Sequence, residues 1–231
     1  MALTMFPRPD VRGNYRRVTK PAIEPITADE LRNHLHLTVD NLDDADAYSL
    51  IATARAYCEE FLSIAFITQT WQAFFDAWPV GSHNEWWDGI REIAYTEVLK
   101  AAGNMVELLP YPLQSVDQVA IYTDLNTQKI YSSATTPSLA DTFHVVKSAT
   151  PPFITPVSTW PAYYPRPEAI QIDFTAGFGL AASDVPAPIR HGLLLFSSYL
   201  FTHRGDDCGL GNAFDLSGAR SIMEIYKVPR L

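Results

Sequence analysis

Few side chains in this sequence could hold a metal ion, and their spacing keeps them apart. His34 and His36 are two residues apart, so they cannot lie on one face of a helix. His191 and His203 are twelve residues apart within one predicted helix, which is too far for both to bind one ion. We therefore predict that these histidines form no metal site.

Two groups of carboxylates could either bind a metal ion or belong to helices. Asp43, Asp44 and Asp46 offer oxygen ligands of the kind that calcium prefers, but the rest of an EF-hand loop is missing. Acidic residues also stabilise the positive end of a helix dipole, so we interpret this group as a helix start. Glu59 and Glu60 occupy adjacent positions of a predicted helix, and we expect both to lie on its solvated face.

Motifs for nucleotide binding and covalent catalysis are also missing. Gly177-Phe-Gly179 lacks the remaining glycine and the strand-to-helix context of a dinucleotide loop, so it predicts a sharp turn. The sequence contains neither a P-loop nor a nucleophile elbow. Cys58 and Cys208 are the only cysteines, and without CxxC spacing they indicate neither a zinc site nor a disulfide framework. We predict that the protein is not an enzyme and uses no cofactor.

The composition indicates a folded, acidic protein. Of its 231 residues, 47% are hydrophobic and 19% are charged, as is usual for a globular chain with one sizeable core. The formal net charge of −9 argues against non-specific nucleic-acid binding by the whole surface, because phosphate binding needs a basic footprint. A proline-containing start without an apolar run predicts no signal peptide, and the two unpatterned cysteines fit a reducing cytosol.

Positive charge is concentrated near the N-terminus. Residues 1–26 are predicted to form an extended arm, because four prolines oppose regular structure there. Residues 1–20 contain only one acidic residue. The basic residues of this arm are Arg8, Arg12, Arg16, Arg17 and Lys20. Two interpretations remain open: a solvated tail, or a docking arm for an acidic partner or DNA.

Two helices are predicted after the arm. Thr27-Ala-Asp-Glu30 is a capping box, in which the threonine hydroxyl and the glutamate carboxylate each accept from the backbone N–H of the other residue. A short helix is therefore expected over 27–37. Residues 43–63 follow their acidic start with one apolar face. We expect this second helix to pack on a third one near the C-terminus.

The third predicted helix, over 184–204, is apolar on nearly all sides and therefore has to be covered by other elements. Asp184 is its predicted cap, and its first turn tolerates Pro186 and Pro188 because the earliest helical N–H groups have no intrahelical partner. Its apolar run is interrupted by two serines and is too short for a membrane span. It is predicted to be a buried core helix.

Strands are predicted between the second and third helices. Five runs rich in β-branched and aromatic residues are 66–78, 105–109, 115–123, 142–147 and 169–175. Residues 81–103 are expected to form an inserted loop or short helix, and the proline-rich segment 151–167 is expected to run extended over the surface. After the third helix, 206–218 is predicted to be a mobile glycine-rich loop and 221–228 a short last helix.

Together these elements predict an α+β fold with a helical core and a central antiparallel β-rich insertion. The predicted helices lie near 27–37, 43–63 and 184–204, with a short helix at the C-terminus. We predict three domains: an extended N-terminal arm over 1–26, a helical core with a C-terminal tail over 27–64 and 180–231, and an inserted β-rich domain over 65–179.

Several short motifs follow one another in the order of a known family. They are ITADELRNHL (26–35), the acidic pair at 43–44, ARAYCEEF (54–61), ITQTW (67–71), LPYPLQSV (109–116), IDFTAGFG (172–179), VPAPIR (185–190) and IYKV (225–228). In this order they resemble the tailed-phage head–tail connector family, also called adaptor or head-completion proteins, in its branch with a β-rich insertion. The longer N-terminal arm and the 81–103 insertion depart from the family pattern.

The resemblance implies a structural virion protein at the head–tail interface, assembled in the host cytoplasm. Proteins of this family form a ring, usually dodecameric, beneath the portal of the capsid and receive the stopper or tail terminator on the other side. The implied partners are therefore other copies of this chain in a ring of twelve, a portal protein and a stopper or tail-terminator protein. DNA would pass through the channel without sequence-specific binding, and no membrane is involved.

The resemblance and the residues together suggest two docking segments. The C-terminal segment follows a glycine-rich hinge and is expected to reach the portal through Ile222, Ile225, Tyr226, Lys227, Val228, Arg230 and Leu231. The alternative is a terminal helix that packs on its own core. The basic residues of the arm are expected to face a neighbouring subunit or DNA.

Two other classes of protein remain open. A tail-tube or minor capsid structural protein would share the aromatic β-rich region but should lack the three helices around it. A hydrolase that uses Asp or His side chains in a cleft of the β-rich region would need convergent titratable groups with perturbed pKa values.

Overall fold

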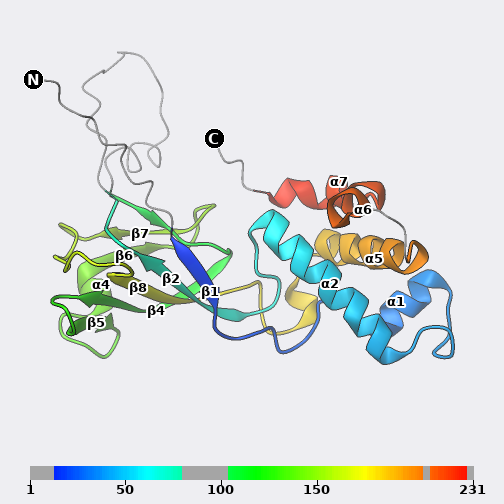
Figure 1. The fold of residues 1–231 in the computed structure, drawn as a ribbon, viewed down its shortest axis with the longest axis horizontal. Coiled ribbons are helices and arrows are strands. Elements are labelled where there is room, and N and C mark those ends of the chain that lie inside the picture. Colours follow the sequence, from blue (N-terminus) through cyan, green and yellow to red (C-terminus); the bar gives the residue numbers. More distant parts are fainter. Residues whose placement is uncertain (1–12, 80–103, 205–208, 228–231) are drawn as a thin grey trace, which may run out of the picture. The chain divides into compact units, whose positions relative to one another are not determined.

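The computed structural model describes residues 13–79, 104–204 and 209–227, which form helices and strands in two compact units (Figure 1). Unit 1 comprises residues 1–17, 71–108 and 115–174, and unit 2 comprises 18–70, 109–114 and 175–231. The chain passes between the units at 17/18, 70/71, 108/109, 114/115 and 174/175. The predictions for 1–12 and 81–103 lie outside the described residues.

Unit 2 contains the predicted helices, and the first two begin where the capping residues of the sequence predict. They are α1 (Ala28–Leu35), α2 (Asp44–Leu62) and α5 (Ala187–Thr202). The capping box before α1 is confirmed, because Thr27 Oγ1 accepts from the Glu30 N–H at 3.1 Å and Glu30 Oε2 accepts from the Thr27 N–H at 2.7 Å. Asp43 caps α2 by accepting from the Asp46 N–H at 2.8 Å.

The core of unit 2 lies between α1, α2 and α5, as predicted for the second and third helices. Leu31, Ile51, Leu193 and Phe196 are fully buried in it. Removing apolar surface of this size from water is the main stabilising contribution, at about 1.5–3 kcal/mol for each large side chain. The described residues contain no helix long and apolar enough to cross a bilayer.

The predicted N-cap of the third helix was wrong by two residues. Asp184 does not cap α5 but ends the short 3-10 helix η1 (Ala182–Asp184), where its carboxylate accepts from the Ala181 N–H at 2.9 Å. Helix α5 begins at Ala187 with Pro186 as its N-cap residue. Because Pro188 has no N–H to lose, the first turn accommodates it.

The prediction of a mobile loop over 206–218 was also wrong for residues 209–218, which the structure describes. Residues 210–216 form α6 (Leu210–Leu216), followed by α7 (Ala219–Met223) and the 3-10 helix η2 (Glu224–Tyr226). Ala213 and Phe214 of α6 are buried, so packing against the core outweighs the local preference of the glycines for irregular structure.

Two sheets account for the β-rich region. The larger has the strand order β1-β2-β8-β4-β5, and the smaller has the order β3-β7-β6. Their strands are β1 (Asn14–Arg17), β2 (Gln69–Phe75), β3 (Val106–Glu107), β4 (Leu113–Tyr122), β5 (Gln128–Ser132), β6 (Phe143–Val146), β7 (Phe153–Pro156) and β8 (Ile170–Ala176). The pairs β1–β2, β4–β5, β3–β7 and β6–β7 are antiparallel. The predicted α+β fold is therefore confirmed.

Two segments of unit 1 differ from the expectation. The stretch predicted to run extended over the surface contains β7, which is the central strand of the smaller sheet and buries Phe153 and Ile154. The predicted extended arm contains β1, which pairs with β2 from Asn14↔Phe74 to Arg17↔Trp71. A one-turn helix, α4 (Leu139–Thr142), precedes β6.

Candidate docking surface

The C-terminal part of unit 2 is anchored on the helical core by aromatic side chains. The fully buried Phe214 ring of α6 lies 5.2 Å from Phe196 of α5, and 5.3 and 5.1 Å from Tyr57 and Phe61 of α2, measured between ring centroids. All three pairs are edge-to-face, an arrangement that aromatic rings prefer over a face-to-face sandwich. These contacts hold α6 against α2 and α5.

Helix α7 fits onto α5 at a glycine. A Cβ atom built on Gly192 would lie 2.6 Å from Cε and 2.9 Å from Cγ of the fully buried Met223, so only glycine lets the methionine approach this closely. The chain after α7 is held as well, because the Tyr111 hydroxyl donates to the Tyr226 carbonyl. The alternative of a terminal helix that packs on its own core therefore applies to α7.

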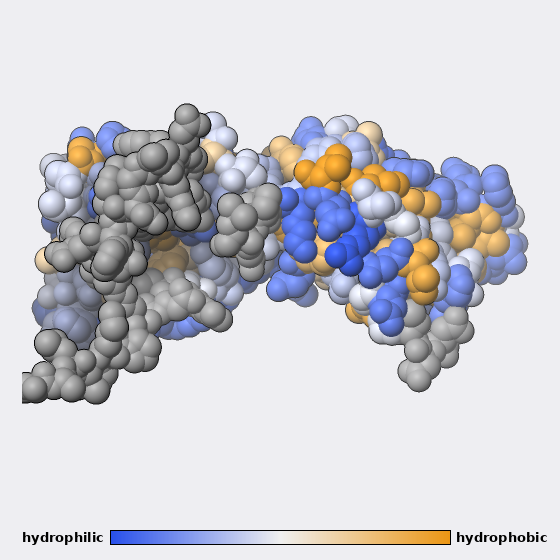
Figure 2. Space-filling model, turned by 90° about the horizontal axis from the view of Figure 1, so that it is seen from above, coloured by the Kyte–Doolittle hydropathy of each residue, from blue (hydrophilic) through white to orange (hydrophobic). Residues whose placement is uncertain are grey.

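The outer face of this anchored segment remains apolar in part. Leu210, Leu216 and Ile225 expose 43%, 67% and 75% of their surface. Figure 2, which looks down on this side of unit 2, shows hydrophobic residues interspersed with polar ones. An exposed apolar residue on a rigid, internally fixed element is a suitable anchor for a protein partner.

The predicted portal-docking residues divide into three groups. Ile222 and Tyr226 are half-buried, and Ile225 and Lys227 are exposed. The Lys227 ammonium lies 3.8 Å from the Phe61 ring centroid, which fixes its side chain on unit 2. Val228, Arg230 and Leu231 lie outside the described residues. Leu210 and Leu216 were not predicted, although the spacing of Leu210, Ala213 and Phe214 was a helical signal.

A buried polar network lies at the opposite end of α2 from its acidic start. Glu59 is only 8% exposed, so the prediction that it lies on a solvated face was wrong, whereas Glu60 is exposed. The Glu59 carboxylate accepts from Arg55 Nη1 and Gln69 Nε2 at 2.7 Å and from the Phe66 N–H at 2.9 Å. Glu24 completes the network by accepting from Arg55 Nε at 2.7 Å.

The network ties three separate segments of unit 2 together. Burial raises the pKa of the Glu59 carboxyl, although Arg55 and the other donors favour its charged form. Burial lowers the pKa of Arg55, but hydrogen bonds and charges from Glu24 and Glu59 outweigh it and the pKa is raised. The arrangement is that of a structural ion pair that fixes α2 between the N-terminal segment and the chain entering β2.

The predicted basic residues of the arm are partly placed on β1. Arg16 lies over the Phe74 ring at 5.4 Å and donates to Gln72, and Arg17 lies over the Trp71 ring at 5.9 Å. Both arginines and Lys20 are exposed. Arg8 and Arg12 lie outside the described residues.

The described residues offer little for catalysis or metal binding. Burial raises the pKa of the Cys58 thiol, which keeps it protonated and unreactive. His34 and His191 come into edge-to-face contact with ring centroids 6.3 Å apart, a pairing that the sequence spacing did not predict. No group of three or more potential ligands occurs among the described residues.

Comparison with known proteins relates this chain to solved structures. No protein-family model and no curated protein matches the sequence. A chain in the neck of the empty gene transfer agent particle, solved with C6 symmetry, matches with a TM-score of 0.69 and 19% identity over 94% of this chain and 97% of that chain. A chain in the virion of the native gene transfer agent particle matches with a TM-score of 0.67 and 19% identity, over 94% of this chain and 96% of that chain.

A third match is a chain in the neck of the native gene transfer agent particle with C12 symmetry, with a TM-score of 0.62 and 19% identity over 94% of this chain and 97% of that chain. All three likenesses extend over both units. At this level of identity they show that the chain shares its fold with chains of gene transfer agent particles, two of them from the neck.

Proposed function

We propose that this chain is a structural protein of the neck of a tailed, phage-like particle, where it acts as a head–tail adaptor. The observation that supports this most is the match over 94% of the chain to a neck protein of a gene transfer agent particle. A common motif alone would match a small part of the chain, whereas here the helical and the β-rich units match together.

The proposed assembly is a ring of twelve copies between the portal and the stopper or tail terminator. Two matching necks have C6 and C12 symmetry, which supports a closed ring for this chain as well. Ring closure requires head-to-tail contacts between two different patches of one subunit. The ring would assemble in the host cytoplasm and remain in the virion at the head–tail interface.

The portal-facing surface in this proposal is centred on Ile225. It includes Ile222, Tyr226 and Lys227 around it, and Val228, Arg230 and Leu231 beyond it. Ile225 is the most exposed of the large hydrophobic residues described, at 75%. Because α7 is fixed by Met223 and η2 by Tyr111, the isoleucine would meet a partner with little ordering cost.

The channel that such a ring encloses would carry DNA without reading its sequence. The net charge of −9 favours weak interaction with the phosphate backbone. In this arrangement the basic residues of the arm make contacts between subunits and do not bind DNA. They are Arg8, Arg12, Arg16, Arg17 and Lys20.

The adaptor function can be tested with purified heads that carry a portal but no neck. The wild-type chain should join these heads, and Ile225→Asp should reduce joining at least tenfold because a carboxylate cannot be buried in an apolar contact. Leu125→Asp is the matched control, since Leu125 is 61% exposed on a turn of unit 1. Deleting 218–231 would be less informative, because it removes the buried Ala219 and Met223 from the core.

The outcomes distinguish an error in the docking surface from an error in the proposed function. Normal joining by Ile225→Asp would show that the portal docks elsewhere. Failure of the wild-type chain to join any head, with the chain folded, would contradict the adaptor function itself.

A further inference from the structure

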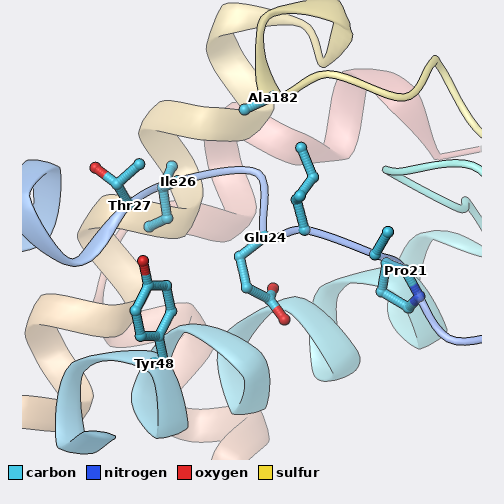
Figure 3. Close-up of a pocket in the computed structure, with 8 residues that line it drawn as sticks. Pro21, Glu24, Ile26, Thr27, Tyr48 and Ala182 are labelled. Carbon is cyan, nitrogen blue, oxygen red and sulfur yellow. The ribbon is translucent and has the colours of Figure 1, made fainter. Parts of the chain in front are cut away.

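An apolar groove lies in unit 2 along the segment that enters α1. It has a volume of about 480 Å³, and its lining includes Pro21, Ile23, Ile26, Tyr48 and Ala182. Figure 3 shows Tyr48 rising from α2 toward the segment before α1. Ile23 and Tyr48 are 43% and 45% exposed, so the groove presents apolar surface to solvent.

The groove is pre-formed and suits an apolar side chain. Glu24 is the one charged residue among the described residues that line it, and its carboxylate accepts from Arg55 Nε at 2.7 Å. Figure 3 shows that the Glu24 side chain points toward α2. The Pro25 carbonyl accepts from Arg190 Nε of α5 at 3.1 Å, which fixes this segment on the helical core. A partner would therefore meet apolar walls that are already in place.

A second apolar surface of unit 2 is the corner at the end of α6, where Leu216 is 67% exposed. The corner is rigid, because Ser217 Oγ donates to the Phe214 carbonyl at 2.8 Å and accepts from the Ala219 N–H at 3.2 Å. A Cβ atom built on Gly218 would meet no atom of the described residues within 4 Å. Leu216 is therefore a fixed, projecting apolar side chain, and it lies outside the portal-facing residues proposed above.

The two surfaces lie on opposite sides of unit 2. In Figure 1, α6 lies above α5, whereas the blue segment that enters α1 and the yellow η1 lie below α5. One copy therefore cannot place its own Leu216 in its own groove. A head-to-tail ring contact requires two different patches on one subunit, whereas a two-fold dimer pairs a patch with itself.

We propose that Leu216 of one copy binds in the groove of the next copy, against Ile23 and Tyr48. The contact joins a projecting apolar side chain to a concave apolar surface, and it removes both from water. Both surfaces are ordered in the single chain, so their association has a low ordering cost. Every copy contains both surfaces, and the contact can therefore repeat around a closed ring. This inference rests on the proposed ring and names one of its contacts.

Cross-linking of full-length chains tests this contact. With Cys208→Ser throughout and Cys58 buried, an Ile23→Cys/Leu216→Cys chain is treated with a short bismaleimide, both in concentrated solution and on portal-bearing heads. A ladder of covalent oligomers is expected, because each copy would be linked to both of its neighbours. An Ile130→Cys/Leu216→Cys chain is the control and should give no ladder, since Ile130 of β5 has the same 43% exposure as Ile23 but lies outside the groove.

Charged substitutions provide a second measurement. Ile23→Asp and Leu216→Asp should each reduce the number of copies bound per head at least tenfold, because a carboxylate cannot be buried in an apolar contact. Ile130→Asp and Leu125→Asp are the controls, matched to them in exposure at 43% and 61%, and should leave this number unchanged. Thermal unfolding checks that all four variants are folded.

The failures of this inference and of the adaptor function are distinguishable. Rings on heads without the ladder, or covalent dimers alone, would overturn the head-to-tail contact and leave the adaptor function intact. A ladder in solution from a chain that never joins heads would support the contact and contradict the adaptor function. A chain that gives no ladder in either sample and never joins heads would overturn both.

Discussion

Glu59 and Glu60 have the same side chain on neighbouring positions of α2, yet their surroundings are opposite. Glu59 is buried and accepts three hydrogen bonds, whereas Glu60 is exposed. Adjacent helical positions are about 100° apart, so one of two neighbours can face the core while the other faces water. The sequence could not show which, because the partners Phe66 and Gln69 come from a segment whose placement depends on the tertiary fold.

Removing the Glu59 carboxylate should destabilise unit 2 strongly. Glu59→Ala leaves Arg55 buried with only Glu24 as a partner and leaves the Phe66 N–H without an acceptor, at a cost of about 3 kcal/mol. Glu60→Ala is the matched control and should change the free energy of unfolding by less than about 0.5 kcal/mol. Urea denaturation measures both, and equal effects would contradict the role of the network.

The same carboxyl predicts a pH dependence with a definite sign. Because burial raises the pKa of Glu59, the folded chain binds its proton more tightly than the unfolded chain does. The contribution of this group to stability therefore falls as pH rises from its unfolded pKa through its folded pKa. The free energy of unfolding of Glu59→Gln should rise relative to wild type over that interval, measured by urea denaturation at several pH values. A free energy of unfolding of Glu59→Gln that falls relative to that of wild type as pH rises would contradict the raised pKa.

At the scale of elements, the caps of α1 and α2 and the packing of α2 on α5 were predictable from the sequence, whereas α6 was not. The capping box at Thr27 and the cap at Asp43, whose carboxylate accepts from the Asp46 N–H, depend on neighbours in the chain. Helix α6 was missed because Gly209 and Gly211 suggest a loop, and its burial against Phe61 and Phe196 comes from distant parts of the sequence. The exposed leucines of this helix were missed for the same reason.

The contact between α5 and α7 predicts a difference between two helical glycines. Gly192→Val would collide with Met223, so it should destabilise the protein by about 2 kcal/mol through overpacking and loosen α7. Among the described residues, a Cβ atom on Gly211 would meet only the Tyr57 hydroxyl, at 3.4 Å, so Gly211→Ala should be neutral or stabilise by up to about 1 kcal/mol. Thermal unfolding compares the two, and a harmless Gly192→Val would contradict the close fit.

At the scale of the whole molecule, the sequence predicted the α+β class but not the order of the strands in the sheets. The order β1-β2-β8-β4-β5 joins strands that are far apart in the sequence, including one from the predicted arm. Strand periodicity shows which faces are buried, as in the alternating β8, but it contains no information on which strand lies next to which. The candidate docking residues could be proposed from the sequence, whereas their division into core and surface required the packing of α7 and η2.

Electron microscopy, along the particle axis, of portal-bearing heads after addition of the purified chain tests the adaptor function most directly. We predict a ring with twelvefold symmetry between the portal and the tail side, in which each subunit contains both the helical and the β-rich unit. A folded chain that stays monomeric and never appears on heads would contradict it.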